Sequence, residues 1–171
     1  MKYLIILITL ISFNSFGAGS KSPEPESVSP GTETKSSVTN ITTDPLEHIE
    51  LLYKLAEKHI YNKQYVKSLK LLKKLTKRED LGTKRADIYN LLGFSYRKID
   101  NPDLDKSFAA YMMALELEPD HVGAHEYLGE LYLMRDNLDK ASDMLLKLEV
   151  LVGKDAQEYK DLFKAIEKYQ S

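Results

Sequence analysis

The sequence contains no cysteine and no tryptophan, and its net charge is only −2 over 171 residues. Without cysteine, the chain has no disulfide bonds, thiolate metal sites or cysteine nucleophiles. A net charge so near zero gives no electrostatic reason to expect binding to nucleic acid. The chain also lacks a Gly-rich phosphate loop, a nucleophile elbow and a His-Glu-x-x-His sequence. We therefore predict that the protein is not an enzyme and carries no cofactor.

The first residues have the pattern of an export signal. Met1 and Lys2 give a positively charged start, an apolar run covers residues 3–13, and small residues follow at Gly17–Gly19. The run of about 11 residues is shorter than the roughly 20 that a membrane-spanning helix needs. We expect residues 1–19 to be a signal peptide cleaved near Gly17–Gly19, with an uncleaved anchor as the alternative. The mature chain would then be periplasmic or secreted, without stable insertion in a membrane.

Composition changes sharply at two further points. Residues 20–44 are rich in Ser, Thr, Pro and Glu, and they contain almost no large apolar side chains. Such a segment cannot bury enough surface to offset its ordering entropy, so we expect a disordered linker. Asp44 and Pro45 then suit the cap and first position of a helix, and Glu47 can complete a capping box. An ordered domain is therefore expected over residues 45–171.

Within this domain, apolar residues recur with helical spacing, and turn residues interrupt the pattern at regular intervals. Loops of only a few residues place consecutive helices side by side and antiparallel. The pattern predicts an all-α fold with helices over residues 45–62, 64–78, 84–99, 103–117, 121–135, 138–151 and 154–169.

One pattern repeats along the chain. Leu92-Gly93 followed by Tyr96 returns as Leu128-Gly129 followed by Tyr132, displaced by 36 residues. A fainter copy, Leu55-Ala56 with His59, precedes both. The repeat predicts three helical units, at roughly 49–82, 86–121 and 122–153, followed by one further helix.

These residues resemble the tetratricopeptide repeat, a helix-turn-helix unit of 34 residues. The resemblance covers about 105 residues of the chain and is best in the middle unit. The motif positions matched there are Tyr89, Leu92, Gly93, Tyr96, Ser107, Tyr111, Ala114 and Pro119. The resemblance implies a short right-handed α-solenoid of three units, with an amphipathic capping helix at 154–169. It also implies a partner protein or peptide bound in a concave groove.

Glycine in a helix interior costs about 0.5–1 kcal/mol relative to alanine, so Gly93 and Gly129 need a compensating contact. A neighbouring helix that approaches closely would supply it. We expect the small residues Ser107 and Ala141, on the second helix of each unit, to face these glycines.

The groove positions of the resembled repeat can be carried onto this chain. Phe94 is the leading candidate among them, because a large ring on an exposed position suits a partner; the alternative is that Phe94 packs against the capping helix or a loop. The predicted partner-binding residues are Tyr53, Glu57, Tyr61, Asp87, Asn90, Phe94, Arg97, Lys98, Glu126, Glu130, Leu133 and Met134.

Charge is uneven along the domain. Residues 47–85 contain 11 Lys or Arg against 5 Asp or Glu, whereas residues 86–171 contain 10 against 17. Many of the lysines fall on the predicted helix 64–78, which is either a solvated face or a contact for an acidic partner. The asymmetry also permits head-to-tail self-association. The two functions that remain open are an envelope protein that binds a peptide or helix, and a structural self-assembling subunit.

One pair of histidines has metal-ligand spacing. His121 and His125 are four residues apart and could share a helix face, where imidazole suits zinc or copper. However, His121 falls at a predicted helix start and His125 at an aromatic packing position of the repeat. We therefore expect both to be structural and predict no metal site.

Overall fold

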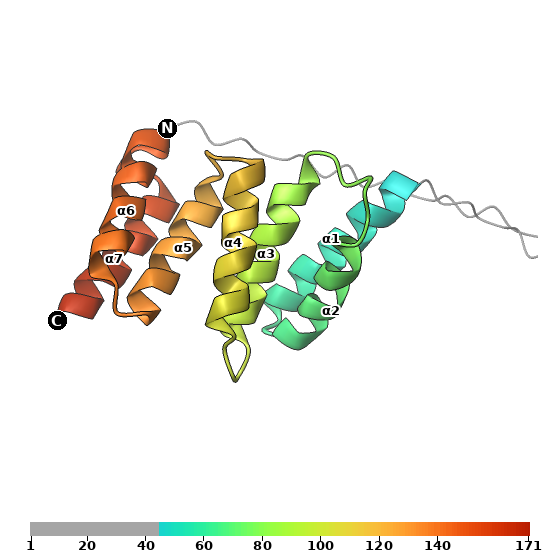
Figure 1. Ribbon diagram of the computed structural model, residues 1–171, viewed down its shortest axis with the longest axis horizontal. Coiled ribbons are helices and arrows are strands. Elements are labelled where there is room, and N and C mark those ends of the chain that lie inside the picture. Colours follow the sequence, from blue (N-terminus) through green and yellow to red (C-terminus); the bar gives the residue numbers. More distant parts are fainter. Residues whose placement is uncertain (1–44) are drawn as a thin grey trace, which may run out of the picture. The chain divides into compact units, whose positions relative to one another are not determined.

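The computed structural model describes residues 45–171, which form seven helices and no strand (Figure 1). The all-α prediction is confirmed, and the predicted helix ends differ from the observed ones by at most three residues. The predicted signal peptide, the linker and the Asp44 cap lie outside the described residues. The helices are α1 (Pro45–Tyr61), α2 (Tyr65–Leu75), α3 (Lys84–Lys98), α4 (Leu104–Leu117), α5 (Val122–Met134), α6 (Leu138–Val152) and α7 (Gln157–Gln170).

Side-chain caps begin three of these helices. Asp103 accepts a hydrogen bond from the backbone N–H of Lys106 at 3.0 Å, and Asn137 accepts one from Lys140 at 3.1 Å. Each cap satisfies one of the backbone N–H groups that have no partner within the helix. His121 caps α5 in the same way. The last helix begins three residues later than predicted, because Gly153 has a φ of 79° and residues 154–156 continue the turn.

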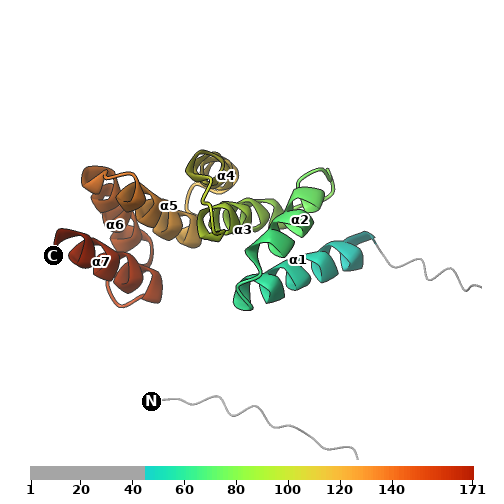
Figure 2. The same ribbon diagram turned by 90° about the horizontal axis from the view of Figure 1, so that it is seen from below.

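The helices form two rows. Each helix packs against the next, and α1 also contacts α3, α3 contacts α5, and α5 contacts α7. No such contact joins α2 to α4 or α4 to α6 within residues 45–171. The first helix of each pair and α7 therefore form the inner row, and the second helices form the outer row (Figure 2). This arrangement confirms the predicted helical-repeat solenoid, with α7 in the place of the capping helix.

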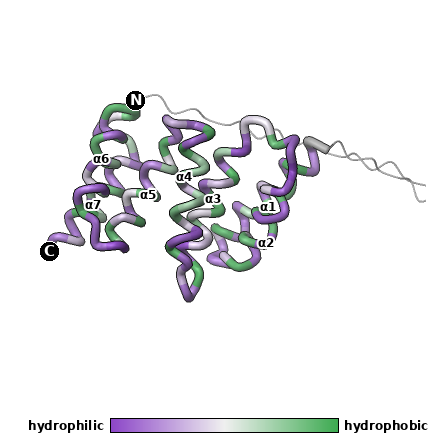
Figure 3. The backbone as a smooth tube through the Cα atoms, viewed as in Figure 1, coloured by the Kyte–Doolittle hydropathy of each residue, from purple (hydrophilic) through white to green (hydrophobic). Residues whose placement is uncertain are grey.

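Hydrophobic and hydrophilic residues are mixed along every helix (Figure 3). None of the described helices combines the length and hydropathy that crossing a membrane requires. The buried apolar side chains gather where one pair meets the next, so no pair completes its core alone. The first cluster joins α1, α2 and α3 around Leu72 and Ile88, the second joins α4 and α5 around Tyr111 and Leu128, and the third joins α5, α6 and α7 around Leu148 and Leu162.

Gly93 is in close contact with α4, as predicted. A Cβ on Gly93 would lie only 2.6 Å from the ring of Tyr111, which is fully buried. The predicted neighbour Ser107 also meets this glycine, because its hydroxyl donates to the carbonyl oxygen of Gly93 at 2.8 Å.

Gly129 has its closest contact with the last helix. A Cβ there would lie 2.5 Å from the side chain of Leu162, on α7, and the nearest atoms do not belong to Ala141. Ala141 is fully buried on α6, as Ser107 is on α4, but the closest contact at this glycine comes from α7. The reason is that α6 carries Leu145 where α4 carries Tyr111, so no ring covers this glycine and the cap helix closes on it instead.

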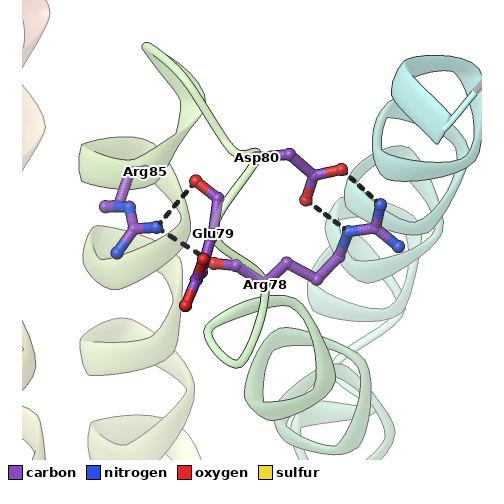
Figure 4. A network of polar contacts seen from close by, with 4 residues as sticks. All are labelled: Arg78, Glu79, Asp80 and Arg85. Atoms are coloured by element: carbon purple, nitrogen blue, oxygen red, sulfur yellow. Dashed lines mark hydrogen bonds and ion pairs between the residues drawn. The ribbon is translucent and has the colours of Figure 1, made fainter.

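A polar network fixes the connection between α2 and α3 (Figure 4). The guanidinium of Arg78 donates from Nε to Asp80 at 2.9 Å and from Nη2 at 2.5 Å. Arg85, in the first turn of α3, donates to the carbonyl oxygens of Arg78 and Glu79 at 3.0 and 3.2 Å. Because Arg85 bonds to the loop backbone, the loop is held against α3.

The contact at Gly129 can be tested by a double-mutant cycle. Gly129→Ala should lower the free energy of unfolding by about 1–3 kcal/mol, because the new methyl group collides with Leu162. In a Leu162→Ala background the same substitution should cost much less, since the colliding side chain is gone. Urea unfolding of the four proteins measures both effects. Equal costs in the two backgrounds would contradict the α5–α7 contact.

Candidate functional site

The twelve predicted partner-binding residues lie on α1, α3 and α5, which belong to the inner row. We call the side of α1, α3, α5 and α7 that faces away from the outer row the inner face. The exposed or half-exposed members are Glu57, Tyr61, Asp87, Phe94, Lys98, Glu130 and Met134. The buried members, which offer a partner little surface, are Tyr53, Asn90, Arg97, Glu126 and Leu133. A partner-binding role for the set stays a prediction.

Phe94 joins three helices through aromatic contacts. Its ring centre lies 4.9 Å from that of Tyr127 on α5 and 6.1 Å from that of Tyr65 on α2. The ring is half-buried, and Lys98 Nζ lies 5.5 Å from its centre. The neighbours of Phe94 are therefore helical residues of adjacent repeats, and part of the ring still reaches solvent.

Arg97 is a structural residue rather than an exposed contact. Its side chain is only 3% exposed and pairs through Nη1 with Glu130 on α5, and its Nε donates to the hydroxyl of Tyr111 at 3.4 Å. The guanidinium carbon lies 5.6 Å from the ring centres of both Phe94 and Tyr127. Such stacking favours the planar cation over an aliphatic side chain. Arg97 therefore ties α3 to α5 and supports the aromatic rings beside it.

Glu126 is buried between helices of the inner row. The residue is 8% exposed, and charged groups on α5, α7 and α3 act on its carboxyl group. Burial raises the pKa of the Glu126 carboxyl to about 8, and the carboxylates of Glu130, Asp161 and Glu158 push it in the same direction. The opposing effect of Arg97 is smaller. At neutral pH the Glu126 side chain is therefore mostly protonated and uncharged.

The sequence did not reveal this property of Glu126. Its position marked it as one charged contact among several, whereas its burial depends on Asp161 and Glu158, which come from a later helix. The only signal in the sequence was that Glu126 occupies the repeat position that Asn90 has in the preceding unit, so that a carboxylate replaces an amide there.

Both histidines of the candidate metal pair form hydrogen bonds within the fold. His121 Nδ1 accepts from the backbone N–H of Ala124 at 3.1 Å, and its Nε2 lies 3.2 Å from a carboxylate oxygen of Asp87. His125 Nε2 donates to the carbonyl oxygen of Pro119 at 2.8 Å. Over residues 45–171, no three His, Cys, Asp or Glu side chains are arranged to hold a metal ion.

A pocket of about 600 Å³ lies beside the loop between α3 and α4. Its charged side chains already pair with one another: Lys106 with Asp103 at 2.5 Å and Arg135 with Asp105 at 2.6 Å. Tyr96, in the wall, has Lys73 Nζ 5.0 Å from its ring centre. With its charges paired internally, this pocket presents no strong attraction for a ligand.

Neither a family model nor a curated protein matches the chain, but several solved structures do. The Yersinia enterocolitica type III secretion chaperone SycD, in complex with a peptide of the translocator YopD, is 18% identical, with a TM-score of 0.59 over 76% of this chain and 93% of that one. A structure of MamA is 22% identical, with a TM-score of 0.58 over 73% and 70%. A CopN–Scc3 complex is 19% identical, with a TM-score of 0.56 over 81% and 83%. These likenesses show a tetratricopeptide-type fold.

The burial of Glu126 predicts a pH-dependent stability. Because the folded pKa of about 8 lies above the ordinary value of 4.5, the folded state is favoured below pH 4.5 and loses this advantage as the pH rises through 8. Glu126→Gln mimics the protonated form, so it should stabilise the protein by about 2–4 kcal/mol at pH 9 and by little at pH 5. Thermal unfolding at pH 5, 7 and 9 measures the difference.

Glu116→Gln is the matched control, because Glu116 is exposed on α4. This variant should differ from the wild type by the same small amount at every pH. If Glu126→Gln behaves like the control, the carboxyl of Glu126 is ionised and solvated in the folded protein.

Proposed function

We propose that the protein is a non-catalytic interaction module that binds a peptide or helix of a partner protein on its inner face. The observation that carries this proposal is the pair of half-buried rings, Phe94 and Tyr127, held together at 4.9 Å on adjacent inner helices. Aromatic side chains held rigidly and still partly exposed are typical of the residues that dominate binding interfaces. Arg97 beneath them holds the two rings in place before any partner arrives.

The row of inner helices suits an extended ligand. Four helices contribute to the inner face, because α1 contacts α3, α3 contacts α5, and α5 contacts α7. Solenoids use such continuous surfaces to bind segments of other proteins. Two of the solved structures with this fold contain a bound peptide or a protein complex by their own descriptions, which supports the proposal at the level of the fold.

The cellular setting is part of the proposal. The charged start, the short apolar run and the small residues at Gly17–Gly19 support export through a cleaved signal peptide. The partner would then be a protein of the bacterial cell envelope, met in the periplasm or outside the cell.

Mass spectrometry of the mature N-terminus tests the export proposal. When the full chain is expressed in a bacterial host, the periplasmic or secreted fraction should contain a protein that begins between Ala18 and Ser20. A chain that keeps Met1 and sediments with membranes would indicate a retained anchor instead.

Binding on the inner face is tested with a displayed library of random peptides, selected against the full chain. Phe94→Ala should weaken the affinity for the selected peptides at least five-fold, because it removes half of the aromatic pair. Leu146→Ala is the control, since Leu146 is 61% exposed on the outer helix α6 and belongs to no inner helix. Isothermal titration calorimetry measures both.

The titration is read together with thermal unfolding, because Phe94 also supports Arg97. A loss of affinity in a folded Phe94→Ala protein supports the proposal. If the control loses affinity as much as Phe94→Ala, or no peptide is selected, binding on the inner face is contradicted.

A second candidate function is a structural self-assembling subunit. The lysines on the exposed side of α2, including Lys67, Lys70 and Lys74, form no ion pair with a carboxylate among the described residues. The acidic residues concentrate in the C-terminal half, so the ends of two chains have complementary charge. Light scattering at tens of micromolar and low salt separates the two functions, because a stable monomer contradicts assembly.

A further inference from the structure

We infer that the exposed side of α2 is a docking surface for a membrane of anionic phospholipid, which the protein contacts through lysine side chains without inserting a helix. We call Lys63, in the turn before α2, together with Lys67, Lys70 and Lys74 the lysine face. The inference goes beyond the proposed function, because α2 belongs to the outer row and the predicted partner-binding residues lie on inner helices. Docking through α2 therefore leaves the inner face free for a peptide.

The lysines of α2 lie opposite the side of the helix that packs into the fold. The buried side chains of α2 are Ser68, Leu69, Leu72 and Leu75. Lys67, Lys70 and Lys74 are spaced three and four positions apart, so they share one side of the helix, and all three are exposed. Because α2 packs against α1 and α3 through its other side, the three ammonium groups point toward solvent.

An exposed apolar side chain lies among these lysines. Val66 is 70% exposed and lines a pocket of about 240 Å³ together with Lys63 and Lys67. Ile99, just after α3, adds a second apolar group to the lining, and Asp100 is the acid in it. A membrane surface suits this combination, because an apolar side chain can enter the headgroup boundary while the lysines stay among the phosphates.

The charge of α2 differs from that of every other described helix. It is the one helix of residues 45–171 that contains no Asp or Glu, and the sequence has no acid between Glu57 and Glu79. No member of the lysine face pairs with a carboxylate of the described residues. Like charges three and four positions apart destabilise a helix, and an anionic surface removes that cost.

The use of lysine favours a fluid anionic surface over a fixed acidic partner. The protein has arginine where it forms defined ion pairs, which are Arg78–Asp80, Arg97–Glu130 and Arg135–Asp105. The planar guanidinium binds a carboxylate with fixed geometry, whereas the ammonium of lysine is a point charge on a flexible stem. Clusters of about four to eight such cations on one side of a helix are typical of binding to anionic lipid.

Vesicle flotation tests the inference on the protein isolated from its expression host. The probes are vesicles of phosphatidylcholine alone and vesicles of equimolar phosphatidylcholine and phosphatidylglycerol. At low salt the protein should bind the anionic vesicles at least ten-fold more strongly, since each lysine near such a surface contributes roughly a five-fold factor. High salt should release it. An apolar N-terminal segment that was not cleaved would bind both kinds of vesicle, so the comparison of lipids separates its effect.

Substitutions on α2 identify the side chains that bind. The α2 variant, Lys67→Gln with Lys70→Gln and Lys74→Gln, should bind anionic vesicles at least ten-fold more weakly than the wild type. Val66→Ser should weaken binding about two-fold and leave its salt dependence unchanged, because it removes only an apolar contact. All these side chains are exposed, so thermal unfolding should show each variant folded.

A triple substitution on α7 is the matched control. Lys160→Gln with Lys164→Gln and Lys168→Gln removes three exposed lysines and changes the net charge equally. This variant should bind anionic vesicles as the wild type does. An equal loss in the two triple variants, or equal binding of the wild type to both lipids, overturns the lysine face as a docking surface.

Two further outcomes would also overturn the inference. Binding to poly-glutamate without binding to vesicles would indicate an acidic protein as the partner of α2. A dimer at low salt that dissociates in the α2 variant, again without vesicle binding, would indicate a second copy of this chain. The selection of peptides on the inner face is a separate measurement, so the proposed function can fail while membrane docking holds, and the reverse.

Discussion

The stack of helices depends on two contacts that only glycine permits. At Gly93 the ring of Tyr111, and at Gly129 the side chain of Leu162, occupy the space where any other residue would place its Cβ, at 2.6 and 2.5 Å. The intrinsic cost of glycine in a helix is small beside the packing it allows. The contact at Gly93 holds α3 against α4 within one pair, and the contact at Gly129 holds α5 against α7 within the inner row.

The same inner row combines structural and functional roles in neighbouring side chains. Arg97 is almost completely buried, and it holds together a carboxylate, a tyrosine hydroxyl and two aromatic rings. Burying an arginine requires this many partners, since an unpaired cation would be costly. Glu126 on α5 is also buried, and burial together with neighbouring carboxylates raises its pKa to about 8, so it stays largely protonated at neutral pH. One buried charge therefore holds the aromatic pair of Phe94 and Tyr127 in place.

Much of the fold could be predicted from the sequence, because helix periodicity and turn residues are local signals. The caps at Asp103 and Asn137, and the close approach at Gly93, follow from residue type and spacing. The Arg97–Glu130 pair and the contact of Leu162 with Gly129 could not be predicted, because each joins residues that are 33 positions apart through packing that no local pattern encodes. For the same reason, the partner-binding residues predicted from the groove positions of the resembled repeat included both buried and exposed side chains.

Nuclear Overhauser effects between the glycines and their covering side chains test the helix packing most directly. Strong effects are expected from the Hα protons of Gly93 to the ring of Tyr111 and from those of Gly129 to the methyl groups of Leu162, with the Gly93 signals shifted by the ring current. If these effects are absent and both glycines have the shifts of solvent-exposed helix, the pairs do not nest as described and the inner face does not form.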